Sequence, residues 1–278
     1  MDFDLLELIK YILLGIVQGV TEVLPISSSG HVELIKGIFN IDMDRNIFFL
    51  IVLNTGSLLA FIVIYFKKLF ELAKSFFVFI FVPQKRAENK ENFIYLMKVV
   101  VACIPAGIAG LLLGDYLENF IENYSLLVAG IGLLITATVI YFVSKLNFEN
   151  NKAKVSWWDV LFIGLAQSAA IVPGISRSGM TTSTALKRDV DITHALNFSF
   201  LMYIFISIGA LGKDLLSESI TINNTEIIYY GFAFIAAIIF TYIAYKFIFN
   251  IFKSGKLNYF SYYCFGVGAL AIFLFYAI

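Results

Sequence analysis

The sequence is poor in charged residues. Only 14% of its 278 residues are Asp, Glu, Lys or Arg, whereas a soluble domain carries about a quarter. Hydrophobic residues make up 60% of the chain, and the mean hydropathy is +0.86. These values exclude an ordinary soluble domain and predict an integral membrane protein. Basic and acidic residues number 20 each, so no excess of positive charge points to nucleic acid as a partner.

Cysteine and histidine are also scarce. The two cysteines, Cys103 and Cys264, lie within apolar runs, where a buried hydrophobic role fits better than a disulfide or a metal ligand. His194 lies near a predicted loop, while His31 belongs to a polar motif in the first part of the chain. We therefore expect neither a disulfide nor a metal site built on cysteine.

Long apolar segments alternate with short polar loops. A helix needs roughly 20 apolar residues to cross a bilayer, and the sequence predicts six such spans, at residues 47–66, 93–113, 125–144, 194–213, 227–249 and 258–277. Residues 69–82 are too few to cross and are expected at the membrane interface. Lys or Arg marks the loops at 67–68, 83–91, 145–154, 187–188 and 253–256 as cytoplasmic. The acidic loops at 115–122 and 214–226 are expected outside.

A polar motif follows the first apolar segment. Residues 15–31 hold a carboxylate, a proline, three consecutive serines and a histidine. Gln18 and Glu22 are four apart and share one face of a helix over residues 5–24, which Pro25 ends. The serines and the glycine after them are typical of a tight loop that opens a second, short helix and binds anions. Because unpaired polar groups are costly in lipid, we expect a functional site here.

A second motif repeats the first one 149 residues later. Without a gap, Gly15, Gln18, Ser27, Ser29 and Gly30 align with Gly164, Gln167, Ser176, Ser178 and Gly179. Each motif joins an apolar helix to a piece too short to span, which predicts two re-entrant helical hairpins on opposite sides of the membrane. The fold expected is an all-α polytopic membrane protein, a single membrane domain over residues 1–278. Its two parts, about 1–145 and 156–278, form an inverted-topology repeat whose broken helices meet near the midplane.

The two hairpin tips together form the candidate site. Arg177 is decisive, because an intramembrane arginine needs an anionic partner and its planar guanidinium suits a phosphate or a carboxylate. Alternatively, Arg177 could form a structural ion pair with Glu22, His31 could be a core histidine, and the serines could only bond neighbouring helices. Asn54 and Asn197, early in the spans after each hairpin, could line the site or bridge helices. We favour a phosphate cradle.

The chain resembles the bacitracin-resistance-type undecaprenyl-diphosphate phosphatases in three signatures: Gln18-x-x-x-Glu22, Pro25-x-Ser27-Ser28-Ser29-Gly30-His31 and Pro173-Gly174-x-Ser176-Arg177-Ser178-Gly179. Length, spacing and hydropathy agree over the whole chain. The resemblance implies hydrolysis of the lipid carrier undecaprenyl diphosphate to the monophosphate and inorganic phosphate, for cell-wall polymer synthesis. It places the enzyme in the bacterial plasma (inner) membrane, with the active site open to the outer face. It also implies that bacitracin competes for the substrate, and it leaves a homodimer open.

The resemblance also assigns roles to individual residues. The catalytic positions are Glu22, Ser28, His31 and Arg177, and the substrate contacts are Gln18, Ser27, Ser29, Gly30, Ser176, Ser178, Gly179 and Thr181. A divalent cation, Mg²⁺ or Ca²⁺, is implied, bound by Glu22 together with the substrate. Many members carry Glu where Gln18 stands, so Glu22 would act alone. We expect Ser28 as the nucleophile with His31 as its base; attack by His31 itself or directly by water stays open.

The main alternative is a polyprenyl-phosphate transporter or flippase, because inverted repeats with broken helices are also a transporter design. A serine and a histidine three residues apart, with a carboxylate nearby, favour an enzyme. An intramembrane serine peptidase would have no clear use for Arg177, whereas a diphosphate would.

Overall fold

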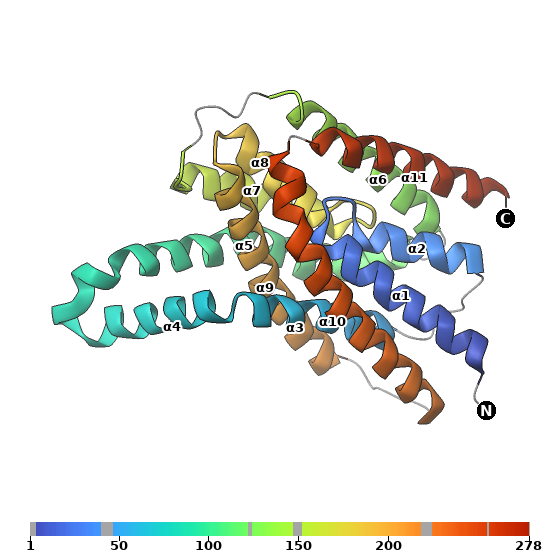
Figure 1. The fold of residues 1–278 in the computed structure, drawn as a ribbon, viewed down its shortest axis with the longest axis horizontal. Helices are drawn as coiled ribbons and strands as arrows, with labels where there is room; N and C mark the ends of the chain where they lie inside the picture. Colours follow the sequence, from blue (N-terminus) through green and yellow to red (C-terminus); the bar gives the residue numbers. More distant parts are fainter. Residues whose placement is uncertain are drawn as a thin grey trace.

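The computed structural model describes residues 4–39, 47–121, 124–146, 152–217, 224–254 and 256–277. Within these ranges the chain is almost entirely helical (Figure 1). One isolated β-bridge joins Lys152 to Val190, and the described residues form no strand. The all-α prediction is therefore confirmed.

The first hairpin consists of α1 (Leu5–Val23) and α2 (Ser28–Phe39). The Asp4 carboxylate begins α1 by accepting a hydrogen bond from the Leu6 amide at 2.8 Å, as an N-cap does. The helix ends at Val23, two residues before Pro25, which agrees with the helix-breaking role expected of the proline. A straight span needs roughly 20 apolar residues. α2 has only 12 residues, and α1 has 19, of which the last turns carry the polar residues Gln18 and Glu22.

Two of the next helices form an arm that projects from the main body: α4 and the first part of α5, whose bounds follow (Figure 1). After α3 (Ile47–Ile64) the chain bends by 74° into α4 (Phe66–Phe81), in keeping with the interfacial helix predicted there. A short 3₁₀ turn, η1 (Pro83–Lys85), leads to α5 (Arg86–Ile121). The loop predicted at 83–91 was thus too long, because residues 86–91 contain neither proline nor glycine to stop a helix. The acidic stretch expected as a loop from 115 is also helical as far as Ile121, and Glu122 lies outside the described residues.

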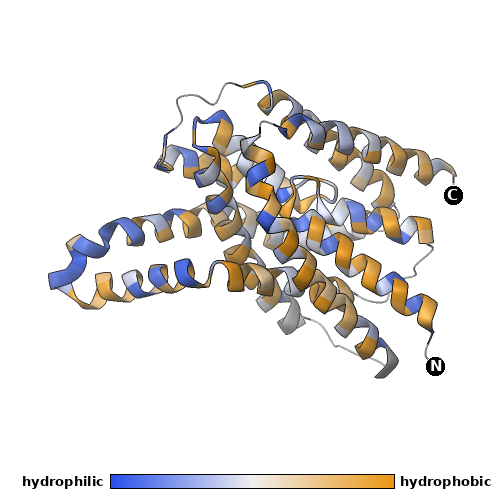
Figure 2. Ribbon diagram, viewed as in Figure 1, coloured by the Kyte–Doolittle hydropathy of each residue, from blue (hydrophilic) through white to orange (hydrophobic). Residues whose placement is uncertain are grey.

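The second part of the chain is also helical. After α6 (Ser125–Val143) come α7 (Trp157–Ser168), the 3₁₀ turn η3 (Ala169–Ile171), α8 (Arg177–Lys187), α9 (Ile192–Ser217), α10 (Asn224–Lys253) and α11 (Leu257–Ala277). In the described residues, five helices are long and apolar enough to span a membrane, or six if α3 and α4 count as one bent span. The protein is therefore a multi-pass membrane protein. Apolar residues dominate the main body, while the end of the arm is hydrophilic (Figure 2).

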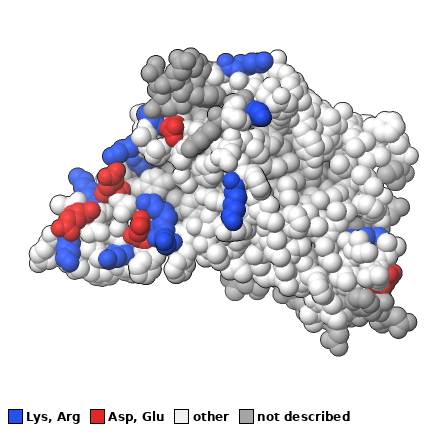
Figure 3. All heavy atoms as spheres, in the orientation of Figure 1, with Lys and Arg blue, Asp and Glu red and all other residues white. Residues whose placement is uncertain are grey.

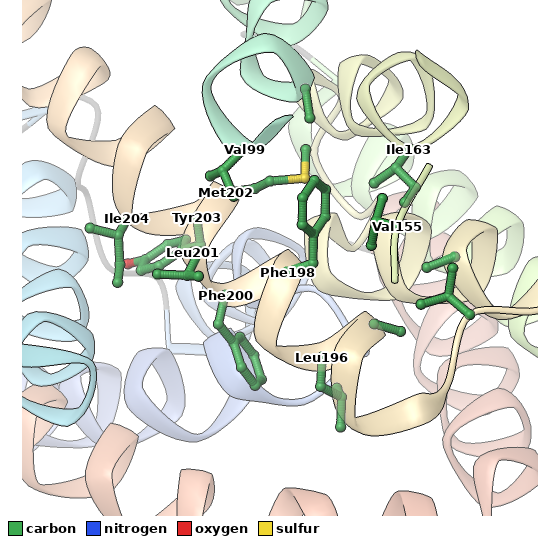
Figure 4. Packing of buried hydrophobic residues seen from close by; sticks show 14 of the residues in the cluster. Val99, Val155, Ile163, Leu196, Phe198, Phe200, Leu201, Met202, Tyr203 and Ile204 are labelled. Carbon is green, nitrogen blue, oxygen red and sulfur yellow. The ribbon is translucent and has the colours of Figure 1, made fainter. Parts of the chain in front are cut away.

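The largest hydrophobic cluster surrounds α9 (Figure 4). Phe198, Phe200 and Met202 are fully buried there, and they pack with residues of α5 and α7 such as Val99 and Ile163. Both cysteines are buried and free, Cys103 in this cluster and Cys264 in a smaller one, which confirms the hydrophobic role expected of them. This rigid centre supports the helices that carry the polar motifs.

The broken helices pack closely on long helices of the other part of the chain. A Cβ atom on Gly15 would lie 2.3 Å from the Ala233 carbonyl oxygen in α10, and one on Gly164 would lie 2.6 Å from the Ala102 carbonyl oxygen in α5. Only glycine allows such backbone contact. Gly15 and Gly164, which align in the sequence, thus have the same packing role.

A buried carboxylate fixes the start of α7. The Asp159 side chain is fully buried and contacts Lys152 at 2.7 Å and Arg188 at 2.6 Å, and it accepts a hydrogen bond from the Ser156 amide in a capping box. Burial alone would raise the pKa of Asp159, but the hydrogen bonds from Lys152, Ser156 and Arg188 lower it to about 2. The ion cluster ties the loop before α7 to the end of α8.

Candidate active site

The first hairpin tip is a sharp turn between α1 and α2. Ser27 has φ +68°, a left-handed conformation that is uncommon for residues other than glycine. Its side-chain oxygen accepts a hydrogen bond from the Gly30 amide at 3.3 Å and so caps α2. The strained turn brings Ser28 back over the last turn of α1, where Glu22 lies.

The second tip uses glycine for its turn. Gly174 has φ +86° and lies so close to Ala129 that a Cβ atom would be 2.0 Å from the Ala129 carbonyl oxygen. Ser176 then caps α8 by accepting from the Gly179 amide at 3.0 Å. Thr136 of α6 braces the turn, because its hydroxyl donates to the Gly174 carbonyl and accepts from the Ser176 amide, both at 2.9 Å.

The two tips contact each other directly. The Gly174 amide donates to the Ser29 hydroxyl at 3.3 Å, and the Ser178 hydroxyl donates to the Leu24 carbonyl at 3.1 Å. The structure therefore brings together the two motifs that the sequence places 149 residues apart.

A cavity of about 190 Å³ opens between the tips. It is lined by polar residues from both motifs together with neighbouring residues: Gln18, Thr21, Glu22, Ser27, Ser28, Ser29, Val32, Glu33, Leu50, Asn54, Ala170, Ile171, Pro173, Ile175, Ser176, Arg177 and Ser178. We call this the tip cavity. Its amide groups and hydroxyls at two helix N-termini, together with a guanidinium, form an environment suited to an anion.

Glu22 is at the centre of a hydrogen-bond network in the tip cavity. Its Oε2 atom accepts from the Ser28 hydroxyl at 2.6 Å and from Gln18 Nε2 at 2.9 Å. Gln18 also donates to Asn54 Oδ1 at 3.0 Å, so Asn54 belongs to the site. Asn197 instead accepts from the Tyr65 hydroxyl at 2.7 Å and bridges α9 to the start of α4. A carboxylate in hydrogen-bond contact with a serine is the geometry a general base requires.

His31 does not occupy the position expected for the base of Ser28. Its Nδ1 atom lies 2.7 Å from the Ser27 carbonyl oxygen and its Nε2 atom 2.9 Å from the Tyr263 hydroxyl. Nδ1 must donate, because a carbonyl only accepts, so the acceptor nitrogen of a neutral ring faces Tyr263. The structure does not pair Ser28 with His31 as expected, because the turn at Ser27 directs the Ser28 hydroxyl to Glu22 instead.

Arg177 reaches the tip cavity from the first turn of α8. Its Nη1 atom donates to the Ser207 hydroxyl at 3.2 Å, and its guanidinium carbon lies 4.9 Å from the centre of the Tyr203 ring. No ion pair with Glu22 occurs among the described residues, so the alternative of a structural salt bridge between the halves finds no support. One hydrogen bond uses one of five guanidinium N–H donors, which leaves donors for an anion.

The remaining predicted residues act mostly as supports. Ser176 and Ser178 line the tip cavity, and their hydroxyls lie 3.4 Å apart. Thr181 is buried, does not line the cavity, and shares a 2.6 Å hydrogen bond with Ser199 of α9. Gly30 and Gly179 supply amides to the two serine caps, as described above.

A divalent cation would find few fixed protein ligands here. The described residues contain no group of three or more His, Cys, Asp or Glu side chains that could hold a metal ion. Two carboxylates line the tip cavity, Glu22 and Glu33, and Glu33 is paired with Lys36 at 3.1 Å. The hard oxygen donors at the centre of the cavity are those of Glu22, Gln18 and Ser28. Such a set fits Mg²⁺ or Ca²⁺ bound jointly by the protein and substrate phosphates, not a closed protein cage.

Sequence reasoning missed Gln167 as a site neighbour. It lines a second cavity of about 140 Å³ on the other side of Arg177, together with Ser207. Within the described residues, neither amide atom of Gln167 has a hydrogen-bond partner, although the residue is only 3% exposed. Its alignment with Gln18 was the signal that could have found it.

The fold and the site define a class: a polytopic α-helical membrane protein with a polar, anion-suited cavity where two broken helical segments meet. Residues 11–270 match the family described as bacitracin resistance protein BacA. The chain belongs to this family.

Curated relatives cover almost the whole chain. It is 41% identical over 266 residues to an undecaprenyl-diphosphatase of Oceanobacillus iheyensis, covering 95% of this chain and 96% of the relative. It is 40% identical over 267 residues to undecaprenyl-diphosphatase 2 of Bacillus thuringiensis, covering 95% and 97%. An undecaprenyl-diphosphatase of Acholeplasma laidlawii is 39% identical over 284 residues, covering 99% of both chains.

Proposed function

We propose that the protein is an undecaprenyl-diphosphatase that supplies the lipid monophosphate carrier for cell-wall polymer synthesis. The observation that carries this proposal is the tip cavity, where Arg177 and two capped helix N-termini surround the Glu22 and Ser28 pair. A phosphoryl group needs such donors on its oxygens and a poised nucleophile. The names of the relatives favour hydrolysis over the transporter alternative. Bacitracin would compete for the lipid diphosphate.

We further propose that the two parts of the chain are an inverted repeat of re-entrant hairpins and spans. Two pairs of equivalent contacts support this: Gly15 and Gly164 pack on alanine carbonyls, and Ser27 and Ser176 cap α2 and α8 by the same bond. By the loop charges, the lysine-rich arm would lie on the cytoplasmic side of the membrane. The protein would then lie in the plasma membrane with the tip cavity open to the outer face.

In the proposed reaction, Ser28 attacks the terminal phosphorus and its proton passes to Glu22. The bond from that phosphorus to the bridging oxygen breaks, and the lipid monophosphate leaves with this oxygen. Water then hydrolyses the phosphoserine and releases inorganic phosphate. Arg177 and the amides of the two tips would hold the phosphoryl oxygens, which is the larger part of catalysis in such transfers. Direct attack by water activated by Glu22 is the competing route, and His31 would support the turn at Ser27.

A divalent cation would be held by Glu22 and the substrate phosphates, with Gln18 beside them. When bound, it neutralises negative charge on the diphosphate. The protein's own part is to present one carboxylate in a network that already orders it.

The test is phosphate release by the purified protein from undecaprenyl diphosphate in detergent. Arg177→Ala should lower turnover by about a hundredfold, because one lost donor in a water-poor site costs about 3 kcal/mol. Rapid-quench experiments with label on the terminal phosphate should trap label on Ser28. Release without any labelled protein would refute the covalent route, and no release at all by the folded wild type would refute the function.

A further inference from the structure

A third cavity, larger than the two described above, lies at the base of the arm, between α3, α4, α5 and α9. It measures about 960 Å³, within the range of cavities that bind drug-sized ligands. Its lining is rich in lysine: Ile64, Tyr65, Lys67, Lys68, Ala87, Lys90, Glu91, Asn92, Ile94, Tyr95, Lys98, Ala153, Lys154, Val155, His194, Asn197 and Leu201. We call it the lysine cavity. It shares no lining residue with the tip cavity.

The charge of the lysine cavity is strongly positive. Five lysines line it against one carboxylate, Glu91, which pairs with Lys154 at 2.8 Å. Lys67 and Lys90 form no ion pair within the described parts of the chain. Basic residues gather over the arm, interspersed with acidic ones, while the rest of the visible face carries only scattered charges (Figure 3). Lys68 pairs with Glu71 at 3.7 Å, and the remaining excess of lysine favours an anion as the occupant of this cavity.

Two of the lysines are held in place rather than left free in solvent. Lys98 is half-buried, donates to the Val155 carbonyl at 2.5 Å, and lies 5.6 Å from the centre of the Trp157 ring. Lys68 donates to Asn92 at 3.3 Å and lies 5.7 Å from the Tyr95 ring. Membrane topology explains positive charge in a loop, but it does not require lysines ordered around a cavity.

Neutral donors and apolar walls complete the lining. The Tyr65 hydroxyl donates to the amide oxygen of Asn197. The Asn197 amide nitrogen has no hydrogen-bond partner among the described residues, so it can donate to a ligand oxygen. Ile64, Ile94 and Leu201 add apolar surface. A phosphate group joined to a hydrophobic body matches this combination.

The position of the lysine cavity favours a lipid as that ligand. α4 bends away from α3 by 74° and exposes Phe66, Phe70, Phe77 and Phe81. Trp157 and Trp158 are exposed nearby at the start of α7. Exposed aromatic residues and an amphipathic helix beside lysines are typical of the level where lipid headgroups lie.

We propose that the lysine cavity binds the phosphate-bearing headgroup of an anionic membrane lipid. Basic pockets between membrane helices are recognised sites for such headgroups. The proposal does not depend on the hydrolysis proposed above, because the two cavities are separate.

Native mass spectrometry of the full-length protein can test this with phosphatidylglycerol, phosphatidylcholine and inorganic phosphate as probes. The wild type should retain phosphatidylglycerol in preference to phosphatidylcholine. In the triple variant Lys67→Gln, Lys68→Gln, Lys90→Gln its Kd should rise at least about tenfold, because each basic residue near a lipid surface contributes about a fivefold factor. The matched control replaces Lys74, Lys85 and Lys187 by Gln, three lysines that do not line the cavity, and should change Kd less than about twofold.

Three results would overturn the proposal. Equal weakening in the control would show a general charge effect, and equal retention of the two lipids would show no headgroup recognition. Inorganic phosphate that binds the wild type as tightly as phosphatidylglycerol, and is lost in the triple variant, would identify a free anion as the ligand. Thermal unfolding of each variant shows whether it is folded, so that a loss of binding is not caused by a loss of structure.

Discussion

Replacing Glu22 by Gln tests whether this carboxylate acts through Ser28. The Oε2 atom accepts bonds of 2.6 Å from Ser28 and 2.9 Å from Gln18, and an amide oxygen in the same place can keep both bonds while it loses the charge. The fold should therefore survive, but a general base is lost. That loss typically slows turnover by about 10² to 10⁴, or roughly 2.7–5.4 kcal/mol in the barrier.

The decisive measurement is a double-mutant cycle on phosphate release under single-turnover conditions. If Glu22 activates Ser28, then Glu22→Gln combined with Ser28→Ala should be no slower than the slower single variant, because both remove the same step. Circular dichroism and thermal unfolding control for folding. If the two factors instead multiply, Glu22 acts independently of Ser28, and the assignment of Glu22 as its base is refuted.

Three further outcomes are expected. Arg177→Lys should remain about a hundredfold slower than the wild type, because lysine lacks the planar fork; near-normal turnover would exclude bidentate recognition. Gln167→Leu should stabilise the protein against thermal unfolding by about 1 kcal/mol, because it removes two unpaired buried polar atoms, and Thr182→Val, which removes another such atom, should act in the same direction. The wild type is expected to lose about 1–2 kcal/mol of stability as the pH falls from about 4 to 2, because a pKa lowered to about 2 stabilises the folded state only while the Asp159 carboxylate is charged. Asp159→Asn should remove this loss, and a variant that keeps the wild-type pH profile in unfolding scans would contradict the reasoning.

Much of the fold could be predicted because its causes are local. Pro25 ends α1 wherever the helix packs, and apolar length alone identifies the long helices. The loop predicted at 83–91 was too long. Its charged residues seemed typical of a loop, but they are also good helix formers, and α5 begins at Arg86. The charged residues at 83–91 therefore did not mark the end of a helix.

The sequence predicts which residues form the site better than it predicts which of them are hydrogen-bonded to each other. The two aligned motifs lie at the tips of the predicted hairpins. Since the tips were expected to meet, Ser28, Glu22 and Arg177 were expected in one region. The partner of Ser28 depends on the left-handed φ of Ser27, and nothing in a row of three serines shows which one takes that conformation. His31 therefore seemed a natural base from its spacing, although its ring is turned to Tyr263 on the last helix, which sequence spacing cannot reveal.

The contact between Ser29 and Gly174 has a consequence for biosynthesis. The two residues are 145 positions apart, and at about 5–20 residues per second a ribosome needs roughly 7–29 s to cover that interval. During this time the first tip has been made, but Gly174, whose amide donates to the Ser29 hydroxyl, has not yet been synthesised. A newly inserted first half therefore carries unpaired polar groups that lipid does not satisfy. We expect a chain stopped after α6 to stay near the membrane surface or to be degraded, and the polar tip to enter the membrane interior only together with its counterpart.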